Sequence, residues 1–169
     1  MPRRKPTPAR TVLEIDWALF GELCRALAVH VARGYRPDLV VGIAKAGVIP
    51  AAIIASILQV EFAAMVIARR HDEDEPELVA GPPPIVHGRR VLLVDETCDT
   101  GDTIKLALNT LKVAGPADVR TAVSFRTGSY QPDFQAFETD KAIVLPWDRE
   151  VIVDGDLVTR PDLAEWLST

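Results

Sequence analysis

The segment from Val91 to Thr103 constrains this chain more than any other part of the sequence. It joins an apolar run, Val91 to Val94, to two adjacent carboxylates, Asp95 and Glu96, and then to a turn of small residues. Such a run predicts a short parallel strand buried on both faces. Because neighbouring side chains on a strand point to opposite faces, the two acids reach a common ligand only where the strand ends and the backbone bends.

The turn after these acids has the features of a phosphate-binding loop. Residues 97–103 are mostly small and include Gly101, so several backbone N–H groups can converge there, and a helix is predicted from Ile104 onward. Unpaired N–H groups and the helix dipole both favour a phosphate at such a helix start. Asp99 on this loop is expected to point away from the phosphate, toward a substrate proton. The alternative is that Asp95 and Glu96 only solubilise a strand end and that Asp99 caps the helix.

The same order of strand, turn and helix recurs along the chain. Further strands are predicted at 39–43, 62–68 and 119–125, and further helices at 15–31 and 48–58. This alternation predicts an α/β fold with a mainly parallel central sheet flanked by helices.

With these residues in view, the segment 91–103 resembles the phosphoribosyl-pyrophosphate (PRPP) signature of the type I phosphoribosyltransferases. Glu96 stands where aspartate is the commoner second acid. The resemblance implies the fold of that family, with a small C-terminal hood. It also implies a reaction in which a nitrogen nucleophile displaces pyrophosphate from C1 of PRPP, with Mg²⁺ holding the diphosphate.

The resemblance assigns a role to each residue of the signature. Asp95 and Glu96 would hold the ribose hydroxyls, and would meet Mg²⁺ through the ribose or through water. The residues around the 5-phosphate would be Asp99, Thr100, Gly101, Asp102 and Thr103. Asp99 would also serve as the general base or acid at the purine N7.

A second loop resembles the pyrophosphate loop of the family. Lys45, Ala46 and Gly47 follow the apolar run 39–43, and Pro50 follows in turn. Lys45 would lie beside the diphosphate, and Ala46 replaces the commoner glycine in a loop that often carries a cis peptide. The alternative is an ordinary turn with a solvated lysine. A P-loop is excluded because Val48 and Ile49 occupy the place of its Lys-Ser/Thr pair.

A third region, residues 131–148, resembles the base-binding end of microbial xanthine-guanine and hypoxanthine phosphoribosyltransferases. By position, Ile143 would offer backbone groups to the base and Asp148 a carboxylate to a second Mg²⁺. The stacking position of the family falls on Ala142, which has no ring, so base affinity should fall or another aromatic such as Trp147 must move in. Arg126 is the candidate reader of the 6-oxo group.

The resemblance covers roughly residues 12 to 150. We expect a disordered basic tail at 1–10 and a single domain at 11–169, with a flexible active-site loop at about 69–90 and the hood at about 130–169. A loop of that length inside a compact domain is typically a lid or is disordered.

Composition sets limits on the class of protein. The chain has 169 residues, of which 48% are hydrophobic, enough for one core, and no apolar stretch is long enough to cross a membrane. The net charge of −5 argues against a nucleic-acid-binding surface.

Cys24 and Cys98 provide no disulfide framework, which suits the cytoplasm. A thiol in the phosphate loop could be activated, but a small space-filling role is favoured for Cys98.

These patterns together predict PRPP-dependent conversion of a 6-oxopurine base (hypoxanthine, guanine or xanthine) to its nucleoside 5-monophosphate, in purine salvage. The partners are PRPP, a purine base and Mg²⁺, and the resemblance implies a homo-oligomer, a dimer or a tetramer. Two alternatives remain open. One is a regulator that senses PRPP or a nucleotide on the same fold, and the other is a phosphoribosyltransferase for a non-purine acceptor.

Overall fold

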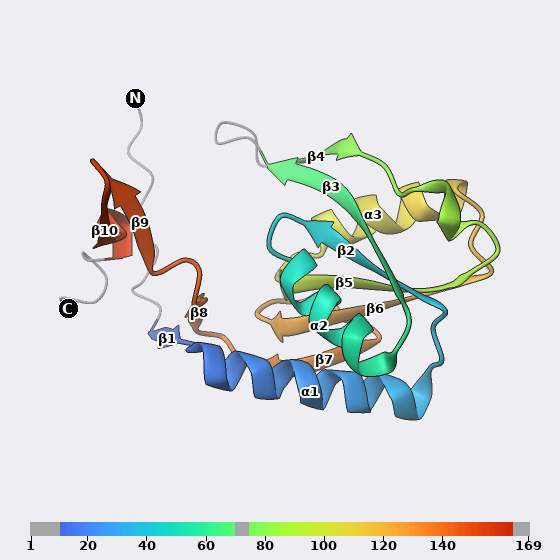
Figure 1. Ribbon diagram of the computed structural model, residues 1–169, viewed down its shortest axis with the longest axis horizontal. Helices are drawn as coiled ribbons and strands as arrows, with labels where there is room; N and C mark the ends of the chain where they lie inside the picture. The colour runs from blue at the N-terminus through green and yellow to red at the C-terminus, as the bar shows by residue number, and fades with distance from the viewer. Residues whose placement is uncertain (1–10, 70–74, 164–169) are drawn as a thin grey trace. The chain divides into compact units, whose positions relative to one another are not determined.

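The computed structural model describes residues 11–69 and 75–163, in which helices and strands alternate (Figure 1). The helices are α1 (Trp17–Gly34), α2 (Val48–Leu58) and α3 (Asp102–Val113), with a short 3₁₀ turn, η1 (Pro84–Val86). The strands are β1 (Val12–Glu14), β2 (Leu39–Ala44), β3 (Glu61–Arg69), β4 (Pro76–Ala80), β5 (Arg90–Cys98), β6 (Asp118–Arg126), β7 (Phe134–Glu138), β8 (Ala142–Val144), β9 (Glu150–Val153) and β10 (Asp156–Thr159).

The central sheet has six strands in the order β4-β3-β2-β5-β6-β7. All neighbouring pairs are parallel except β3 with β4, which are antiparallel. From β2 the chain passes through α2 to β3 on one side, whereas β5 lies on the other side of β2. The strand order therefore reverses between β2 and β5, and the carboxyl edge at such a reversal is where open α/β sheets bind ligands.

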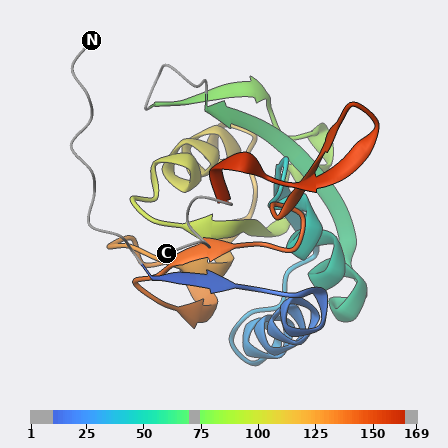
Figure 2. The same cartoon turned by 90° about the vertical axis from the view of Figure 1, so that its left-hand side faces the viewer.

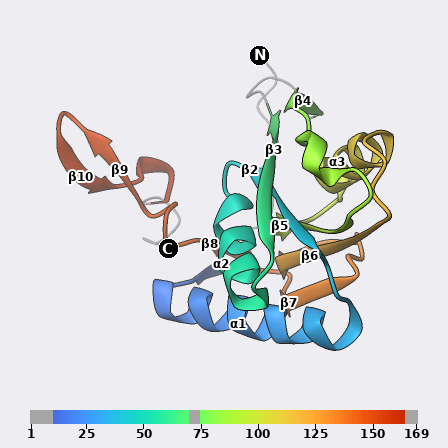
Figure 3. The ribbon, with the colours of Figure 1, turned by 45° about the vertical axis from the view of Figure 1, so that its right-hand side comes forward.

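Helices cover both faces of this sheet (Figures 2 and 3). On one face Leu27 and Val31 of α1 and Ile54 of α2 pack with even-numbered residues of β5 such as Leu92. On the other face α3 packs through Leu111 and its neighbours against odd-numbered residues of β5. Both faces of β5 are buried, which explains why its first half is a continuous apolar run rather than an alternating one.

The chain divides into two compact units: the sheet unit, residues 22–139, and a unit that combines residues up to Gly21 with residues from Asp140 on. In the second unit, β1 pairs in parallel with β8, and β9 pairs with β10 in an antiparallel hairpin. Trp147 packs edge-on against Phe20, with ring centroids 4.9 Å apart, and also lies beside Trp17. This second unit combines both ends of the chain, whereas the hood was expected at about residues 130–169.

The mainly parallel α/β fold is confirmed, and each predicted helix and strand is present. Three expectations on boundaries need correction. β5 does not stop at Val94 but continues to Cys98, because Asp95, Thr97 and Cys98 keep their register with β6. The segment 69–90 is not one irregular loop: residues 76–80 form β4 against β3, and residues 70–74 lie outside the described residues. The hood begins at Asp140 rather than near 130, because β7 pairs with β6.

Among the described residues, no helix combines the length and the apolar character that a bilayer-spanning segment needs.

Candidate active site

A cavity of about 340 Å³ lies at the carboxyl ends of β2, β3 and β5, at the reversal of strand order. Its lining is formed by the ends of these three strands, by the loops after β2 and β5 and by the start of α3. The lining residues are Ile43, Ala44, Lys45, Ala46, Ile67, Arg69, Asp95, Glu96, Thr97, Cys98, Asp99, Thr100, Gly101, Asp102, Thr103 and Ile104. The two loops that the sequence marked as pyrophosphate and phosphate loops therefore open into one cavity.

The loop after β2 places Lys45 and Ala46 at the cavity wall. The peptide bond between Ala44 and Lys45 is cis. Gly47 stands behind the wall: a Cβ atom there would lie 2.6 Å from the carbonyl oxygen of Ile43 and 2.7 Å from Oδ1 of Asp95. Only glycine allows the first turn of α2 to approach β5 this closely.

Asp95 is the buried acid of the site, with only 7% of its surface exposed. Its Oδ1 accepts a hydrogen bond of 2.9 Å from the backbone N–H of Glu96. Burial raises the pKa of the Asp95 carboxyl well above its usual range, and the neighbouring Glu96 carboxylate acts in the same direction.

Both acids line the cavity although β5 continues past them. In a regular strand, odd-numbered and even-numbered side chains face opposite sides of the sheet. Cys98 nevertheless packs in the same core cluster as Val91 and Leu93, so this alternation is lost between Leu93 and Cys98. The loss occurs within the strand rather than at its end.

The thiol of Cys98 is 3% exposed, and burial raises its pKa to about 11, with the nearby Asp95 and Asp99 adding to the rise. A reactive thiol has a lowered pKa, so Cys98 has the space-filling character favoured from the sequence.

Residues 99–101 form the loop after β5, and α3 begins at Asp102, so Asp102 and Thr103 belong to its first turn. Gly101 has a φ of +81°, a left-handed conformation that suits glycine. The hydroxyl of Thr100 donates a hydrogen bond of 2.6 Å to Asp102, and this bond lowers the pKa of the Asp102 carboxyl. Lys105 donates to the Thr100 carbonyl at 3.2 Å. The sequence assigned no role to Lys105, which balances the charge of an acidic helix start.

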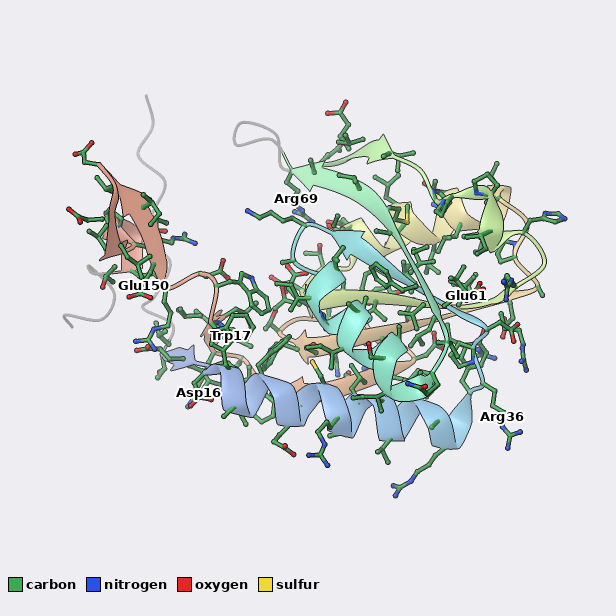
Figure 4. All side chains as sticks on the ribbon, viewed as in Figure 1. Asp16, Trp17, Arg36, Glu61, Arg69 and Glu150 are labelled. Carbon is green, nitrogen blue, oxygen red and sulfur yellow. The ribbon has the colours of Figure 1, made fainter. Side chains whose placement is uncertain are left out.

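Arg69 is the functional candidate that the sequence argument missed. It ends β3 and lines the cavity (Figure 4), and its guanidinium lies 3.4 Å from the Thr103 hydroxyl. The signal was present, because a basic residue ends a predicted strand that runs parallel to 39–43 and 91–94. The sequence pattern placed Arg69 at the start of the flexible loop expected at about 69–90.

The predicted base-binding residues are divided between the two units. Arg126 ends β6 in the sheet unit, is not part of the cavity lining, and donates hydrogen bonds to backbone carbonyls. Ala142 and Ile143 lie on β8 in the other unit and are in register with Val12 and Leu13 of β1. Asp148, in the same unit, lies 3.8 Å from the guanidinium of Arg160. Trp147, the possible substitute ring, is held in the aromatic cluster with Trp17 and Phe20.

No group of three or more His, Cys, Asp or Glu side chains is placed to hold a metal ion anywhere in residues 11–69 and 75–163.

An open parallel sheet, a cavity at its switch point, paired acids and a phosphate loop leading into a helix define the class of type I phosphoribosyltransferase folds. The chain belongs to the phosphoribosyl transferase domain family, whose family model matches residues 15–154. It is accordingly a phosphoribosyltransferase.

The relatives named for their activity include purine phosphoribosyltransferases and an orotate phosphoribosyltransferase of Methanocorpusculum labreanum, which is 30% identical over 94 residues, 56% of this chain and 53% of that relative. Xanthine-guanine phosphoribosyltransferase of Nitratidesulfovibrio vulgaris is 27% identical over 158 residues, which are 90% of this chain and 94% of the relative. The crystal structure of purine phosphoribosyltransferase from Pyrococcus horikoshii has a TM-score of 0.75 at 26% identity, over 86% of this chain and 99% of that one. A hypothetical protein from Neisseria gonorrhoeae, solved with bound ppGpp, has a TM-score of 0.73 at 24% identity, over 87% of this chain and 93% of that one, and shows the fold alone.

Proposed function

We propose that this protein transfers the 5-phosphoribosyl group of PRPP to a 6-oxopurine base, giving the nucleoside 5-monophosphate and pyrophosphate. The observation that carries the proposal is the single cavity of a phosphoribosyltransferase into which Lys45, the acid pair and the loop 99–103 all open. The purine class is supported by the named relatives, xanthine-guanine and purine phosphoribosyltransferases, at 27% and 26% identity.

The two basic side chains of the cavity would bind the pyrophosphate end of PRPP. Lys45 follows β2 and Arg69 ends β3, and these strands are adjacent in the sheet. A guanidinium and an ammonium on neighbouring strand ends can contact different oxygens of one diphosphate.

The acids and the helix start would hold the rest of the substrate. Asp95 and Glu96 would accept hydrogen bonds from the ribose hydroxyls. The N–H groups at the start of α3 and the hydroxyls of Thr100 and Thr103 would donate to the 5-phosphate. In this arrangement C1 of the ribose lies between the two loops, where the base attacks.

The reaction itself needs one proton transfer. N9 of the base forms a bond to C1 while the bond between C1 and the pyrophosphate oxygen breaks, and its electron pair leaves with pyrophosphate. The proton on N7 of the base would pass to the Asp99 carboxylate. The positive charge that develops at C1 is stabilised by the acids around it.

The charge of the cavity fits a requirement for Mg²⁺. Among the described lining residues, four are acidic (Asp95, Glu96, Asp99 and Asp102) and two are basic (Lys45 and Arg69). Such a lining does not by itself attract a polyanion. Bound Mg²⁺ would neutralise the diphosphate and make it a better leaving group. Its ligands would be PRPP oxygens and water, with Asp95 and Glu96 nearby and Asp148 at a second ion.

By the family resemblance, backbone groups of Ile143 would bind the edge of the base. Ala142 contributes no ring, so we expect weaker base binding than an aromatic residue at this position would give. Replacing Ala142 with Trp should lower the KM for the accepted base.

The proposal is tested by Mg²⁺-dependent pyrophosphate release from PRPP with hypoxanthine, guanine, xanthine, adenine and uracil. We expect turnover with one or more 6-oxopurines and little with adenine or uracil. Asp99→Asn should reduce kcat by about 10² to 10⁴-fold and change PRPP affinity far less, because it removes the proton acceptor.

A matched control is Asp154→Asn, which changes an exposed acid in the β9–β10 turn outside the cavity lining. It should leave kcat unchanged. Tight PRPP binding without turnover on any base would contradict the enzyme proposal and favour a sensor. Unchanged turnover in Asp99→Asn would remove the proton-transfer role.

A further inference from the structure

A second loop stands directly behind the phosphate loop. The supporting loop, residues 127–130, is the first part of the connection from β6 to β7, and two of its backbone N–H groups donate to the phosphate-loop segment. Thr127 donates to the carbonyl of Cys98 at 2.8 Å, and Tyr130 donates to the carbonyl of Asp99 at 3.2 Å. The backbone on both sides of the Cys98–Asp99 peptide is thus fixed from outside the cavity.

This supporting loop also contacts the Asp99 side chain. A Cβ atom at Gly128 would overlap Oδ1 of Asp99 and would approach its carbonyl oxygen to 2.6 Å, so the carboxylate rests against the bare Cα of Gly128. The ring of Tyr130 packs in the same way against Gly101, where an added Cβ would overlap the ring. The position of the Asp99 carboxylate is therefore coupled to the position of the supporting loop.

Arg126 ties the supporting loop in place. Its Nε donates to the carbonyls of Gly128, at 3.1 Å, and of Tyr130, at 2.8 Å. Its NH1 lies 3.0 Å from the carboxylate of Glu138 on β7. The Arg126 side chain is only 14% exposed, so these charge-assisted bonds form in a partly desolvated setting where they are strong.

We propose that Arg126 is a positioning residue for Asp99, acting through Gly128 and Tyr130, rather than a reader of the base. The inference rests on the proposed function, because it assigns Asp99 the proton transfer. A planar guanidinium can serve two carbonyls and a carboxylate at fixed angles, whereas a lysine ammonium at the end of a flexible stem cannot. This explains why arginine suits the position.

The two roles of Arg126 predict different kinetics. As a positioning residue, Arg126→Met should lower kcat at least tenfold, because a small misplacement of a reacting group is costly, while the KM of the base changes less than threefold. Arg126→Lys should remain impaired. A base reader would instead show a raised KM for 6-oxopurines only, with recovery in Arg126→Lys.

Gly128→Ala tests the same connection without touching Arg126. The added methyl group must displace the Asp99 carboxylate, so kcat should fall at least tenfold with the KM values of PRPP and base changed less than threefold. Arg120→Met is the matched control, because Arg120 lies on the same strand and pairs with Asp118 and Asp133 at 3.5 and 3.3 Å. It should leave kcat within twofold of the wild type.

A readout without turnover separates failure of this inference from failure of the proposed function. Hydrogen exchange of the Thr127 and Tyr130 amides should accelerate at least tenfold in Arg126→Met and stay unchanged in Arg120→Met. If the wild-type protein turns over no base, the proposed function fails. The exchange rates would still show whether Arg126 holds the supporting loop in place. Unchanged exchange in Arg126→Met, or wild-type kcat in Gly128→Ala, would overturn the inference.

Discussion

At the scale of single residues, Asp95 lowers the stability of the folded protein but provides a hydrogen-bond acceptor for the substrate. A carboxylate that is 7% exposed and adjacent to Glu96 is costly to ionise, and its pKa is raised accordingly. The same burial makes it a fixed hydrogen-bond acceptor beside the pyrophosphate loop.

Replacing Asp95 with Asn should therefore stabilise the protein at neutral pH and weaken PRPP binding. The amide oxygen can still accept the N–H of Glu96, and no charge is buried. The pKa of Asp95 is raised on folding above its ordinary value of 3.8, so above pH 3.8 the folded state binds more protons than the unfolded state. The stability of the wild-type protein therefore falls as the pH rises from 3.8 through the pKa of the folded state. Urea unfolding should show an advantage for the variant of about 1 kcal/mol at pH 7.5 and a smaller one at pH 4.5. An advantage that did not grow with pH would contradict the raised pKa.

At the scale of elements, β2 and β5 must stay in register for their two loops to meet. Asp38, just before β2, accepts bonds from the backbone N–H and the guanidinium of Arg90 at the start of β5, at 3.0 Å and 2.6 Å. These bonds lower the pKa of Asp38 to about 2. One side chain thus ties the amino ends of the two strands whose carboxyl ends form the site.

Asp38→Asn should lower the Tm at pH 6, and the difference from wild type should shrink as the pH falls. The pKa of Asp38 falls from its ordinary value of 3.8 to about 2 on folding. The carboxylate therefore stabilises the folded protein fully above pH 3.8, and this stabilisation is lost as the pH falls through about 2. Thermal melts at pH 6, 4 and 3 would follow this loss. Glu22→Gln is the control, because the Glu22–Arg25 pair on α1 is exposed on both sides and should contribute little. A constant deficit at all three pH values would refute the assignment.

At the scale of the whole molecule, a chain with net charge −5 must bind a highly charged anion. Long-range electrostatics oppose the approach of PRPP, so binding depends on local groups and on cations that accompany the substrate.

We therefore expect PRPP to raise the Tm only when Mg²⁺ is present. At 100 times Kd, a ligand specific for the folded state adds about 2.7 kcal/mol, which corresponds to a shift of roughly 5–10 °C for a domain of this size. Differential scanning fluorimetry with PRPP and Mg²⁺, and with PRPP and EDTA, checks this. An equal shift in EDTA would remove the metal from the proposal.

Most of the secondary structure followed from local patterns. Buried parallel strands read as apolar runs, and the small-residue turns after 39–43 and 91–94 marked the phosphate-type loops. The errors fell where pairing decides the outcome. β5 continues through Asp95 and Glu96 because β6 offers it partners, and β4 forms in a polar segment because β3 presents an open edge. Both partner strands were predicted, but which segments pair with them, and how far the pairing extends, cannot be seen in the local sequence.

The sequence by itself determined the α/β fold, the two loops and the identity of the paired acids, because these depend on periodicity and on residues close together along the chain. Only the tertiary structure decided that Arg69 joins the cavity, that Gly128 supports Asp99 and that Arg126 bonds to a loop. The first two relations join residues about thirty positions apart along the chain, and such contacts are set by which strands lie side by side. The Arg126 bonds span only two and four positions, but they depend on how the loop folds back onto the end of β6.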